Sequence, residues 1–504
     1  MENSINNLEP KKVFKYFSDI CKIPHGSGNL DGIVNYLVDF AKSHNLRYIV
    51  DDVKNVIIYS KSDQTHSDEQ TRRGELCEPV ILQSHTDMVC VKTPSSTIDM
   101  SKDSLDIYVD GDYLRARDTS LGADDGIGVA IILAILDDDD NTYPPIEALF
   151  TSDEETGMYG AIGVDGKFFK SKRLINIDSE NENELTVSCA GGSHCISELK
   201  VERLKVDQKK YLSYELLIAG GLGGHSGMEI HKGRANAICE MAYVLKCLND
   251  ENIDFYLLSI SAGKFINVIC PEAECKLFIN PDDEVKFKNL ISKLNSELKS
   301  EYNLCDPNIE LSCTGEFNEP KNCMGEFNEP LTKESASIII DTLLSLPQGL
   351  IEISQEFINL PWTSLNLGVI ETKDDKITLA TLVRSNDDIK RNKLVKKYET
   401  IIKNANGSMK VEGSYPAWRY NKDSKLKSSM IEAYKDVLGK DLEVVATHGG
   451  LECGLLMERI KDLEAVSIGP TLYSVHSTDE KLLISSVKNV YNFLKKYLSI
   501  IGPN

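Results

Sequence analysis

The fold of this chain is limited above all by short apolar runs that lead into acidic residues or histidine. An amphipathic stretch over 13–43 comes first, and the runs that follow are Asn55 to Tyr59, Pro79 to Leu82, Ile146 to Thr151 and Leu174 to Ile177. Alternation of helical and strand patterns predicts an α/β fold, with a mostly parallel sheet flanked by helices. Ligands of open α/β sheets bind at the carboxyl ends of strands. The charged ends of the last three runs are therefore candidates for a site.

The length of 504 residues predicts two domains. From about Gly191 the pattern changes to longer polar and apolar strands mixed with helices, which is typical of an α+β domain. The segment from Gly413 to Asp423 carries turn residues and a proline, and helix–strand alternation returns after it. We therefore expect a first domain of 1–191 and 413–504, with a second domain of 192–412 inserted into it.

Charge and composition exclude several classes of partner. The formal charge of −22, from 56 basic and 78 acidic residues, opposes binding to nucleic acids and anionic membranes. The longest apolar stretch, Val129 to Leu136, suits a buried helix rather than a membrane span, and the polar run after Met1 does not resemble a secretory signal. The 13 cysteines form no C-x-x-C pair and are expected to be reduced. We expect a cytoplasmic protein.

Two stretches are expected to be surface loops. Residues 62–75 are polar and rich in serine, threonine and charge. Residues 313–332 contain a near-duplicate, CTGEFNEPKN followed by CMGEFNEPLT. Two copies are too few for a solenoid, and long surface loops cost little stability. A tolerated loop expansion is the favoured interpretation, and a regulatory or binding loop is the alternative.

The first candidate motif is SHTDMV, which places His85 and Asp87 two residues apart at an expected strand end. A neutral imidazole is a good zinc ligand, and a nearby carboxylate can hold the other ring nitrogen. Taken singly, this pair is better explained by a structural histidine.

The second motif is TSLGADDGIG, in which Asp124 and Asp125 precede the apolar helix expected over Gly126 to Leu136. Aspartate at this position can simply cap the helix, where it meets the positive end of the helix dipole. The same carboxylate has two oxygens with which to bridge two cations, and the flanking glycines allow close approach. The two roles are compatible.

The third motif is ALFTSDEETG, in which Glu154 and Glu155 follow an apolar run. A solvated surface pair is the simpler explanation. A metal-dependent hydrolase, however, needs one carboxylate to bind metal and another to move a proton. Repulsion between the two would raise the pKa of the uncoordinated carboxyl group.

The last two motifs are LINIDSE, which supplies Asp178, and SVHSTDE, which supplies His476. The set then holds two histidines, two aspartates and a glutamate, mostly at strand ends. Two ligands for each ion and one bridge are what a two-zinc hydrolase requires. Together the motifs favour a dinuclear metal site.

These motifs resemble those of the aminoacyl-histidine dipeptidases, also called Xaa-His or cytosolic non-specific dipeptidases. That family belongs to the dinuclear-zinc peptidases related to carnosinase and carboxypeptidase G. The resemblance also covers CKIPHGSGN, GGHSG, HKGRANAI, THGGLECG and GPTLYSVHS, in the same order along the chain. It implies that one ion is bound by His85 and Asp178, the other by Glu155 and His476, and that Asp124 bridges them.

The resemblance also implies roles for residues around the metals. Glu154 would be the general base and acid, and Asp87 would orient His85. The domain of 1–191 and 413–504 would be catalytic, and 192–412 would be a ferredoxin-like lid or dimerisation domain. The implied substrate-binding residues are His225, Asn267, Arg384, Gly449 and Gly450. One departure is Asp125, where relatives often have asparagine.

The predicted activity is metal-dependent hydrolysis of dipeptides, either of the Xaa-His type or with broad specificity. Zinc is the expected metal, although manganese and cobalt also suit mixed histidine and carboxylate sites. The resemblance implies a homodimer. A deacylase of N-acyl amino acids using the same site is one alternative. A metal-free scaffold is another, but its signature would be loss of ligands, and every expected ligand is present.

Overall fold

The computed structural model describes residues 5, 7–61, 77–138, 142–315 and 329–502. The chain forms two compact units. The first comprises Met1–Ser188, Trp418–Ala446 and Leu451–Asn504, and the second comprises Cys189–Ala417 and Thr447–Gly450. The second unit thus begins and ends a few residues outside the expected 192–412, and the short segment Thr447–Gly450 is an addition to it. The expected loop of 62–75 lies outside the described residues, as does most of the duplicate in 313–332.

The main sheet of the first unit has eight strands in the order β1-β2-β6-β3-β7-β19-β8-β18. Its central strands are parallel, since β3 pairs in parallel with β6 and β7, and β7 with β19. The edge strands β1 and β2 run antiparallel. The bounds are β1 (Arg47–Val50), β2 (Val56–Tyr59), β3 (Val80–His85), β6 (Ile146–Thr151), β7 (Arg173–Asn176), β8 (Glu184–Thr186), β18 (Glu443–Val445) and β19 (Glu464–Ser467).

Helices cover this sheet, and a second sheet of four short strands accompanies it. The helices are α2 (Lys11–Ile20), α3 (Asp31–Ser43), α5 (Ala123–Leu136), α6 (Tyr159–Gly163), α11 (Lys425–Leu438), α12 (Cys453–Arg459) and α13 (Ile484–Ile501). The short strands are β4 (Ile107–Asp110), β5 (Tyr113–Ala116), β20 (Leu472–Tyr473) and β21 (Lys481–Leu483). This arrangement confirms the α/β class predicted from the alternating pattern.

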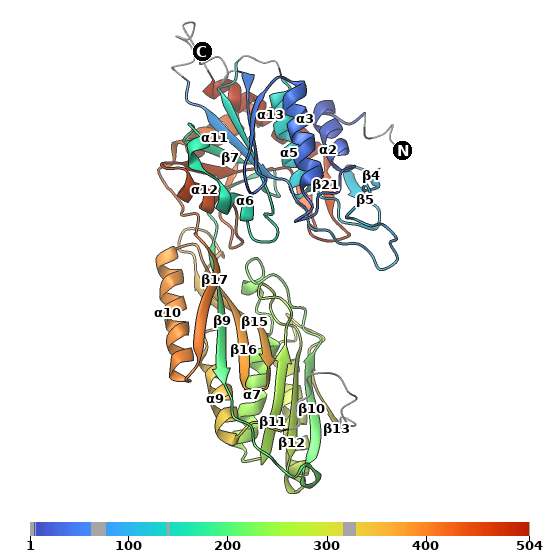
Figure 1. The fold of residues 1–504 in the computed structure, drawn as a ribbon, viewed down its shortest axis with the longest axis vertical. Coiled ribbons are helices and arrows are strands. Elements are labelled where there is room, and N and C mark those ends of the chain that lie inside the picture. Colours follow the sequence, from blue (N-terminus) through green and yellow to red (C-terminus); the bar gives the residue numbers. More distant parts are fainter. Residues whose placement is uncertain (1–4, 6, 62–76, 139–141, 316–328, 503–504) are drawn as a thin grey trace. The chain divides into compact units, whose positions relative to one another are not determined.

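Helices α2, α3 and α5 show how sequence dictates local structure. Helix α5 is buried from Asp125 to its end and packs on α2 and β3 (Figure 1), as its unbroken apolar sequence requires. The amphipathic stretch over 13–43 forms two helices rather than one. Pro24 has no backbone N–H to donate, and Gly28 has a φ of 79°, so the chain turns between α2 and α3.

The second unit is α+β. Its antiparallel sheet has nine strands in the order β13-β10-β12-β11-β15-β16-β9-β17, with β14 paired to β15. The strands are β9 (Gly191–Lys200), β10 (Leu212–Ala219), β11 (Phe255–Ala262), β12 (Ala273–Ile279), β13 (Glu310–Gly315), β14 (Gly349–Ile353), β15 (Pro361–Thr372), β16 (Lys376–Ser385) and β17 (Ser408–Tyr415). The helices are α7 (Ala237–Asp250), α8 (Glu284–Glu301), α9 (Lys333–Ser345) and α10 (Asp388–Asn404).

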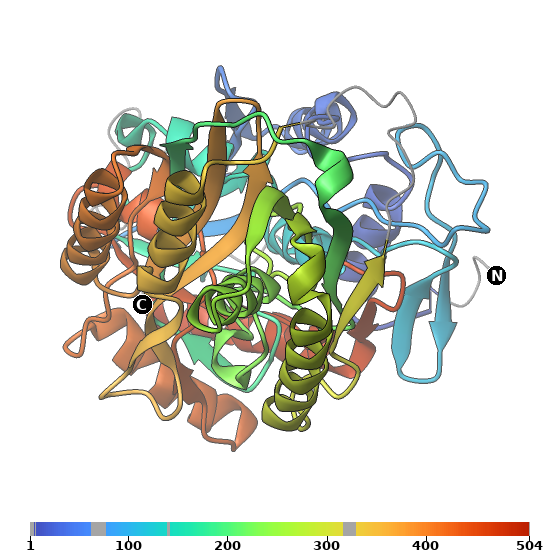
Figure 2. The same ribbon diagram turned by 90° about the horizontal axis from the view of Figure 1, so that it is seen from below.

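Helix α7 contacts both α8 and α9 and lies between them in Figure 2. Their apolar faces form one core with the sheet, to which Leu245, Phe287 and Ile340 contribute fully buried side chains. Among the described residues, no helix combines the length and apolar character needed to cross a bilayer.

Candidate metal centre

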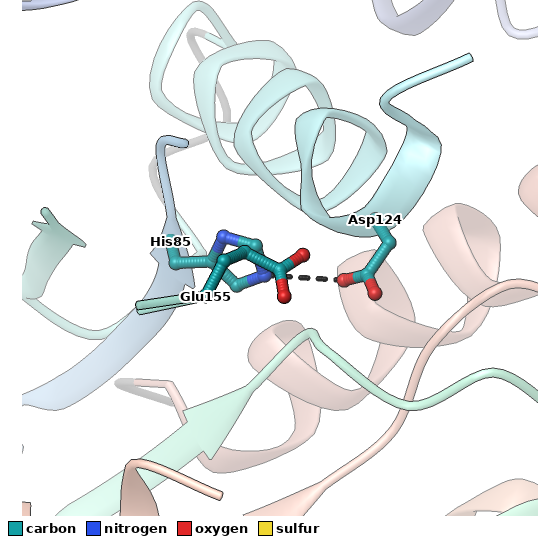
Figure 3. Close-up of side chains that lie close together, drawn as sticks. All are labelled: His85, Asp124 and Glu155. Atoms are coloured by element: carbon teal, nitrogen blue, oxygen red, sulfur yellow. Dashed lines mark hydrogen bonds and ion pairs between the residues drawn. The ribbon is translucent and has the colours of Figure 1, made fainter. Parts of the chain in front are cut away.

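Three predicted ligands meet at the carboxyl end of the main sheet. Atoms of His85, Asp124 and Glu155 that can bind a metal all lie within 4.8 Å of one another (Figure 3). His85 ends β3, Glu155 follows the adjacent parallel strand β6, and Asp124 lies in the first turn of α5. Neighbouring parallel strands bring their carboxyl ends to the same edge, which explains why residues far apart in sequence meet here.

Asp124 lies between two histidines. Its Oδ1 is 3.1 Å from Nε2 of His85, and its Oδ2 is 3.1 Å from Nε2 of His476. Each histidine faces a further carboxylate: Nε2 of His85 is 3.6 Å from Oδ1 of Asp178, and Nε2 of His476 is 2.8 Å from Oε1 of Glu155. The ligand atoms thus form two groups, one at each oxygen of Asp124.

The electrostatics of the site favour cations. Burial raises the pKa of Asp178 to about 7. Burial lowers the pKa of His476, but the carboxylates of Asp124 and Glu155 outweigh this effect and raise it to about 11. The same competition raises the pKa of His85, where the carboxylate of Asp178 is the largest opposing influence. The carboxylates around both imidazoles therefore favour positive charge at the centre.

The donor set fits divalent metal ions. The ion pairs that Asp124, Glu155 and Asp178 form within the described part of the chain involve only histidines, without lysine or arginine. Oε1 of Glu155 is buried and accepts no hydrogen bond from the described residues, although Nε2 of His476 is close. Imidazole and carboxylate together suit zinc, manganese or cobalt. These residues could hold such ions.

Asp87 connects His85 to the backbone of Glu154 and Glu155. Its Oδ1 accepts a hydrogen bond from the backbone N–H of Glu154 at 2.9 Å, and its Oδ2 accepts from the N–H of Glu155 at 3.3 Å and from the hydroxyl of Ser27 at 2.7 Å. Nδ1 of His85 lies 3.0 Å from the backbone oxygen of Asp87 and 3.5 Å from its Oδ1. Asp87 therefore restrains both neighbours.

Glu154 is the other glutamate of the pair and has a perturbed carboxyl group. Burial raises its pKa well above the ordinary value, with a further contribution from the charge of Glu155 and an opposing one from His85. Such a shift brings a carboxyl group closer to the range in which general bases operate.

Glu480 was not singled out from the sequence, yet it holds the start of α5. Its carboxylate accepts backbone hydrogen bonds from Leu121 at 2.7 Å, Gly122 at 3.1 Å, Ala123 at 2.9 Å and Asp124 at 3.5 Å. Helix α5 has no side-chain cap of its own. In the sequence, Glu480 is recognisable only as an acidic residue shortly after His476. No local pattern links it to the start of α5.

Glu452, in the motif THGGLECG, is completely buried. Its Oε2 accepts hydrogen bonds from Gln83 and Thr151, both at 2.6 Å, and Gln83 in turn accepts one from Asn176 at 2.7 Å. Burial raises the pKa of Glu452 to about 7. These hydrogen bonds connect β3, β6 and β7 close to the strand ends where the candidate metal ligands lie.

The predicted substrate-binding residues lie in the second unit. Arg384 on β16 is 5% exposed, donates to the Tyr415 hydroxyl at 2.9 Å, and lies 3.4 Å from Nε2 of His225. Its Nε is buried without an acceptor among the described residues, and no described carboxylate pairs with it. A buried guanidinium of this kind favours a carboxylate ligand.

The other predicted residues in this unit are placed differently. Asn267 is exposed, and its backbone carbonyl accepts a hydrogen bond from Ser226 at 2.9 Å. Gly449 and Gly450 lie in the segment Thr447–Gly450, where the Gly449 carbonyl accepts from the N–H of Ala190 at 3.1 Å. His448 in that segment is buried between Ser364 at 2.8 Å and Asn386 at 3.1 Å.

Comparison with known proteins identifies the family of the chain. The model of peptidase family M20/M25/M40 matches residues 81–499. The chain belongs to this family. It is 32% identical to the cytosol non-specific dipeptidase of Escherichia coli strain K12, over 99% of each chain.

Two solved structures share the fold of the chain. The aminoacylhistidine dipeptidase of Vibrio alginolyticus matches with a TM-score of 0.82 and 29% identity, over all of both chains. A tripeptidase of Staphylococcus aureus matches with a TM-score of 0.60 and 14% identity, over 98% of this chain and 99% of that one. Membership of a peptidase family makes this chain a hydrolase of peptide bonds, with the histidine and carboxylate cluster as its candidate metal centre.

Proposed function

We propose that the chain is a dinuclear metallo-dipeptidase. The observation that carries the proposal is the pair of histidines at opposite oxygens of Asp124, each 3.1 Å away. On this proposal His85 and Asp178 would hold one ion, Glu155 and His476 would hold the other, and Asp124 would be shared by the two. The full-length similarity to a cytosol non-specific dipeptidase supports dipeptides as the substrates and the cytoplasm as the location.

Each residue of the centre has a defined task in this mechanism. Bound divalent ions supply Lewis-acid chemistry, since they lower the pKa of water and polarise a carbonyl group. Glu154 accepts the proton of the attacking water and delivers it to the leaving amine, for which its raised pKa is suited. Asp87 keeps Glu154 in place through its backbone N–H. Zinc is the proposed metal, with manganese or cobalt able to replace it.

The second unit is proposed to supply recognition of the substrate. Arg384 and its neighbour His225 would bind the terminal carboxylate of the peptide, because the guanidinium is buried and has no carboxylate partner among the described residues. Asn267, Gly449 and Gly450 are further candidates. Binding of the terminal carboxylate by these residues would limit the substrates to very short peptides. We also propose a homodimer, which light scattering of the purified protein would test.

The test is hydrolysis of a substrate panel by chelated and by metal-reconstituted protein. The panel contains Ala-His, Gly-Gly, Leu-Leu, β-Ala-His and an N-acetyl amino acid. We expect cleavage of the dipeptides only after zinc, manganese or cobalt is restored. Cleavage of the N-acetyl compound alone would identify a deacylase instead. Absence of activity with every metal would indicate a scaffold.

A further inference from the structure

The turn of residues 23–29 joins α2 to α3 and carries most of the motif CKIPHGSGN. It runs beside the segment that follows β3, where Gly26 forms a β-bridge with Met88. The N–H of Met88 donates to the backbone oxygen of His25 at 3.1 Å, and the N–H of Asn29 donates to that of Gly26 at 2.8 Å. These backbone hydrogen bonds fix the turn beside the carboxyl end of β3.

The first contact of the turn with the metal centre is made through Asp87. The hydroxyl of Ser27 donates to Oδ2 of Asp87 at 2.7 Å. The same carboxylate accepts the backbone N–H groups of Glu154 at 2.9 Å and Glu155 at 3.3 Å. Hydrogen bonds to a charged acceptor are stronger than those between neutral groups, and Asp87 is buried. The orientation of this carboxylate, and with it the backbone of Glu154, therefore depends on the Ser27 hydroxyl.

The second contact is made through Asp153. The N–H of Gly28 donates to Oδ1 of Asp153 at 2.6 Å. Asp153 has a φ of 47°, in the left-handed region that aspartate adopts more readily than most residues. Its backbone oxygen accepts from the N–H of Tyr159 at 3.2 Å. The Asp153 side chain thus connects a sharply turned backbone, directly before Glu154, to the 23–29 turn.

The backbone is what places Glu154. Within the described part of the chain, no hydrogen bond or ion pair engages its carboxylate, whereas its N–H is held by Asp87. A general base must lie within hydrogen-bond reach of the proton that it accepts. Any shift of the loop that carries Glu154 would therefore move the base away from that proton.

We infer that Ser27 and Asp153 are positioning residues for Glu154, and that the 23–29 turn acts on proton transfer through these two hydrogen bonds. The inference rests on the proposed function, because it needs Glu154 as the general base. Neither residue is among the proposed metal ligands. Both act through the backbone of one loop, which gives them an effect on turnover that can be separated from metal binding.

Substitution of Ser27 tests the first hydrogen bond. At saturating metal, kcat and KM are measured with the dipeptide that the wild-type protein cleaves fastest. Ser27→Ala should lower kcat by about 10- to 100-fold, the usual effect of losing a hydrogen bond just outside a metal site. KM should stay within about threefold of wild type, because a general base acts in the transition state. Ser27→Thr keeps the hydroxyl and should restore kcat to within about threefold.

Asn29→Ala is the matched control from the same turn. The Asn29 side chain donates to the backbone oxygen of Ser101 at 3.1 Å rather than to the metal centre. We expect this variant to keep kcat within about twofold of wild type, whatever its effect on thermal unfolding. The comparison separates an effect on Glu154 from a general loosening of the turn.

Substitution of Asp153 tests the second hydrogen bond. Asp153→Asn keeps an acceptor oxygen and tolerates the positive φ, whereas Asp153→Gly tolerates the φ but removes the acceptor. The asparagine variant should retain kcat within about threefold, and the glycine variant should lower it by about tenfold or more. Since both contacts restrain one loop, Ser27→Ala combined with Asp153→Gly should lower kcat by more than the product of the single effects.

The possible outcomes are distinct. Wild-type kcat in Ser27→Ala, equal losses in Ser27→Ala and Ser27→Thr, or an equal loss in Asn29→Ala would overturn the inference while the dipeptidase activity stood. A lower kcat that metal analysis traces to lost metal would also contradict it. If the wild-type protein cleaves no dipeptide with any metal, the proposed function fails, and the inference fails with it.

Discussion

Glu154 differs from the other acids of the centre in that no described hydrogen bond or ion pair engages its carboxylate, although Asp87 holds its backbone. We expect Glu154→Gln to lower kcat by roughly 10²- to 10⁴-fold, the usual contribution of a general base. Metal content should stay unchanged because the proposed ligands are intact. Steady-state kinetics and metal analysis of the same sample check both statements. The exposed Glu458→Gln serves as control, and near wild-type turnover in Glu154→Gln would disprove the assigned role.

Glu480 affects the centre through Asp124, because its carboxylate accepts a hydrogen bond from the backbone N–H of that residue. Glu480→Gln keeps the shape but removes the charge and one of the two oxygens that accept hydrogen bonds from the start of α5. We expect weaker metal binding, activity that returns at excess metal, and a loss of about 1–3 kcal/mol in the free energy of unfolding. Titration against a chelator and urea unfolding measure these quantities. The neighbouring exposed Asp479→Asn is the matched control, and equal metal affinities in both variants would contradict the prediction.

Among the elements, α5 is held unusually close to the end of β7. A Cβ at Gly128 would overlap the carboxylate of Asp125 and would lie 2.6 Å from the backbone oxygen of Ile177, the residue before Asp178. Alanine normally stabilises a helix relative to glycine by up to about 1 kcal/mol. Gly128→Ala should instead destabilise the protein by about 1–3 kcal/mol and weaken metal binding, because the clash is with backbone. Thermal unfolding and metal titration test this expectation.

Gly126→Ala in the same helix is the comparison. Its Cβ would meet the edge of the Phe17 ring at 3.3 Å, a contact that a small shift relieves. Equal stabilities of the two variants would show that α5 can move away from β7 without cost.

The same elements show what sequence could predict. The runs that became β3, β6 and β7 are local patterns, so the strands and the ligand candidates that follow them could be read directly, and the structure brings those candidates together. Strand β19 could not be predicted to lie between β7 and β8, nor Glu480 to reach the start of α5. Both depend on pairing across the whole chain, which leaves no periodic signal in either partner.

At the scale of the whole molecule, the two units should respond differently to metal. All the proposed ligands belong to the first unit, so bound ions stabilise that unit alone, by about 2.7 kcal/mol per site when free metal is about 100-fold above Kd. Calorimetry with and without a chelator should show two unfolding transitions. The midpoint temperature of one should change with metal, and that of the other should not. A single transition shifting as a whole would mean that the units do not unfold independently.

The position of β19 has a consequence for how the protein is made. A ribosome delivers β7, β8 and the entire second unit before β19, and His476 emerges only after that strand. A nascent or prematurely released chain can therefore fold its second unit while the sheet of the first unit lacks an internal strand. Such a chain would contain His85 and Asp124 but would lack His476. On the proposed ligand set, a chain could bind both ions only once it has been synthesised past His476.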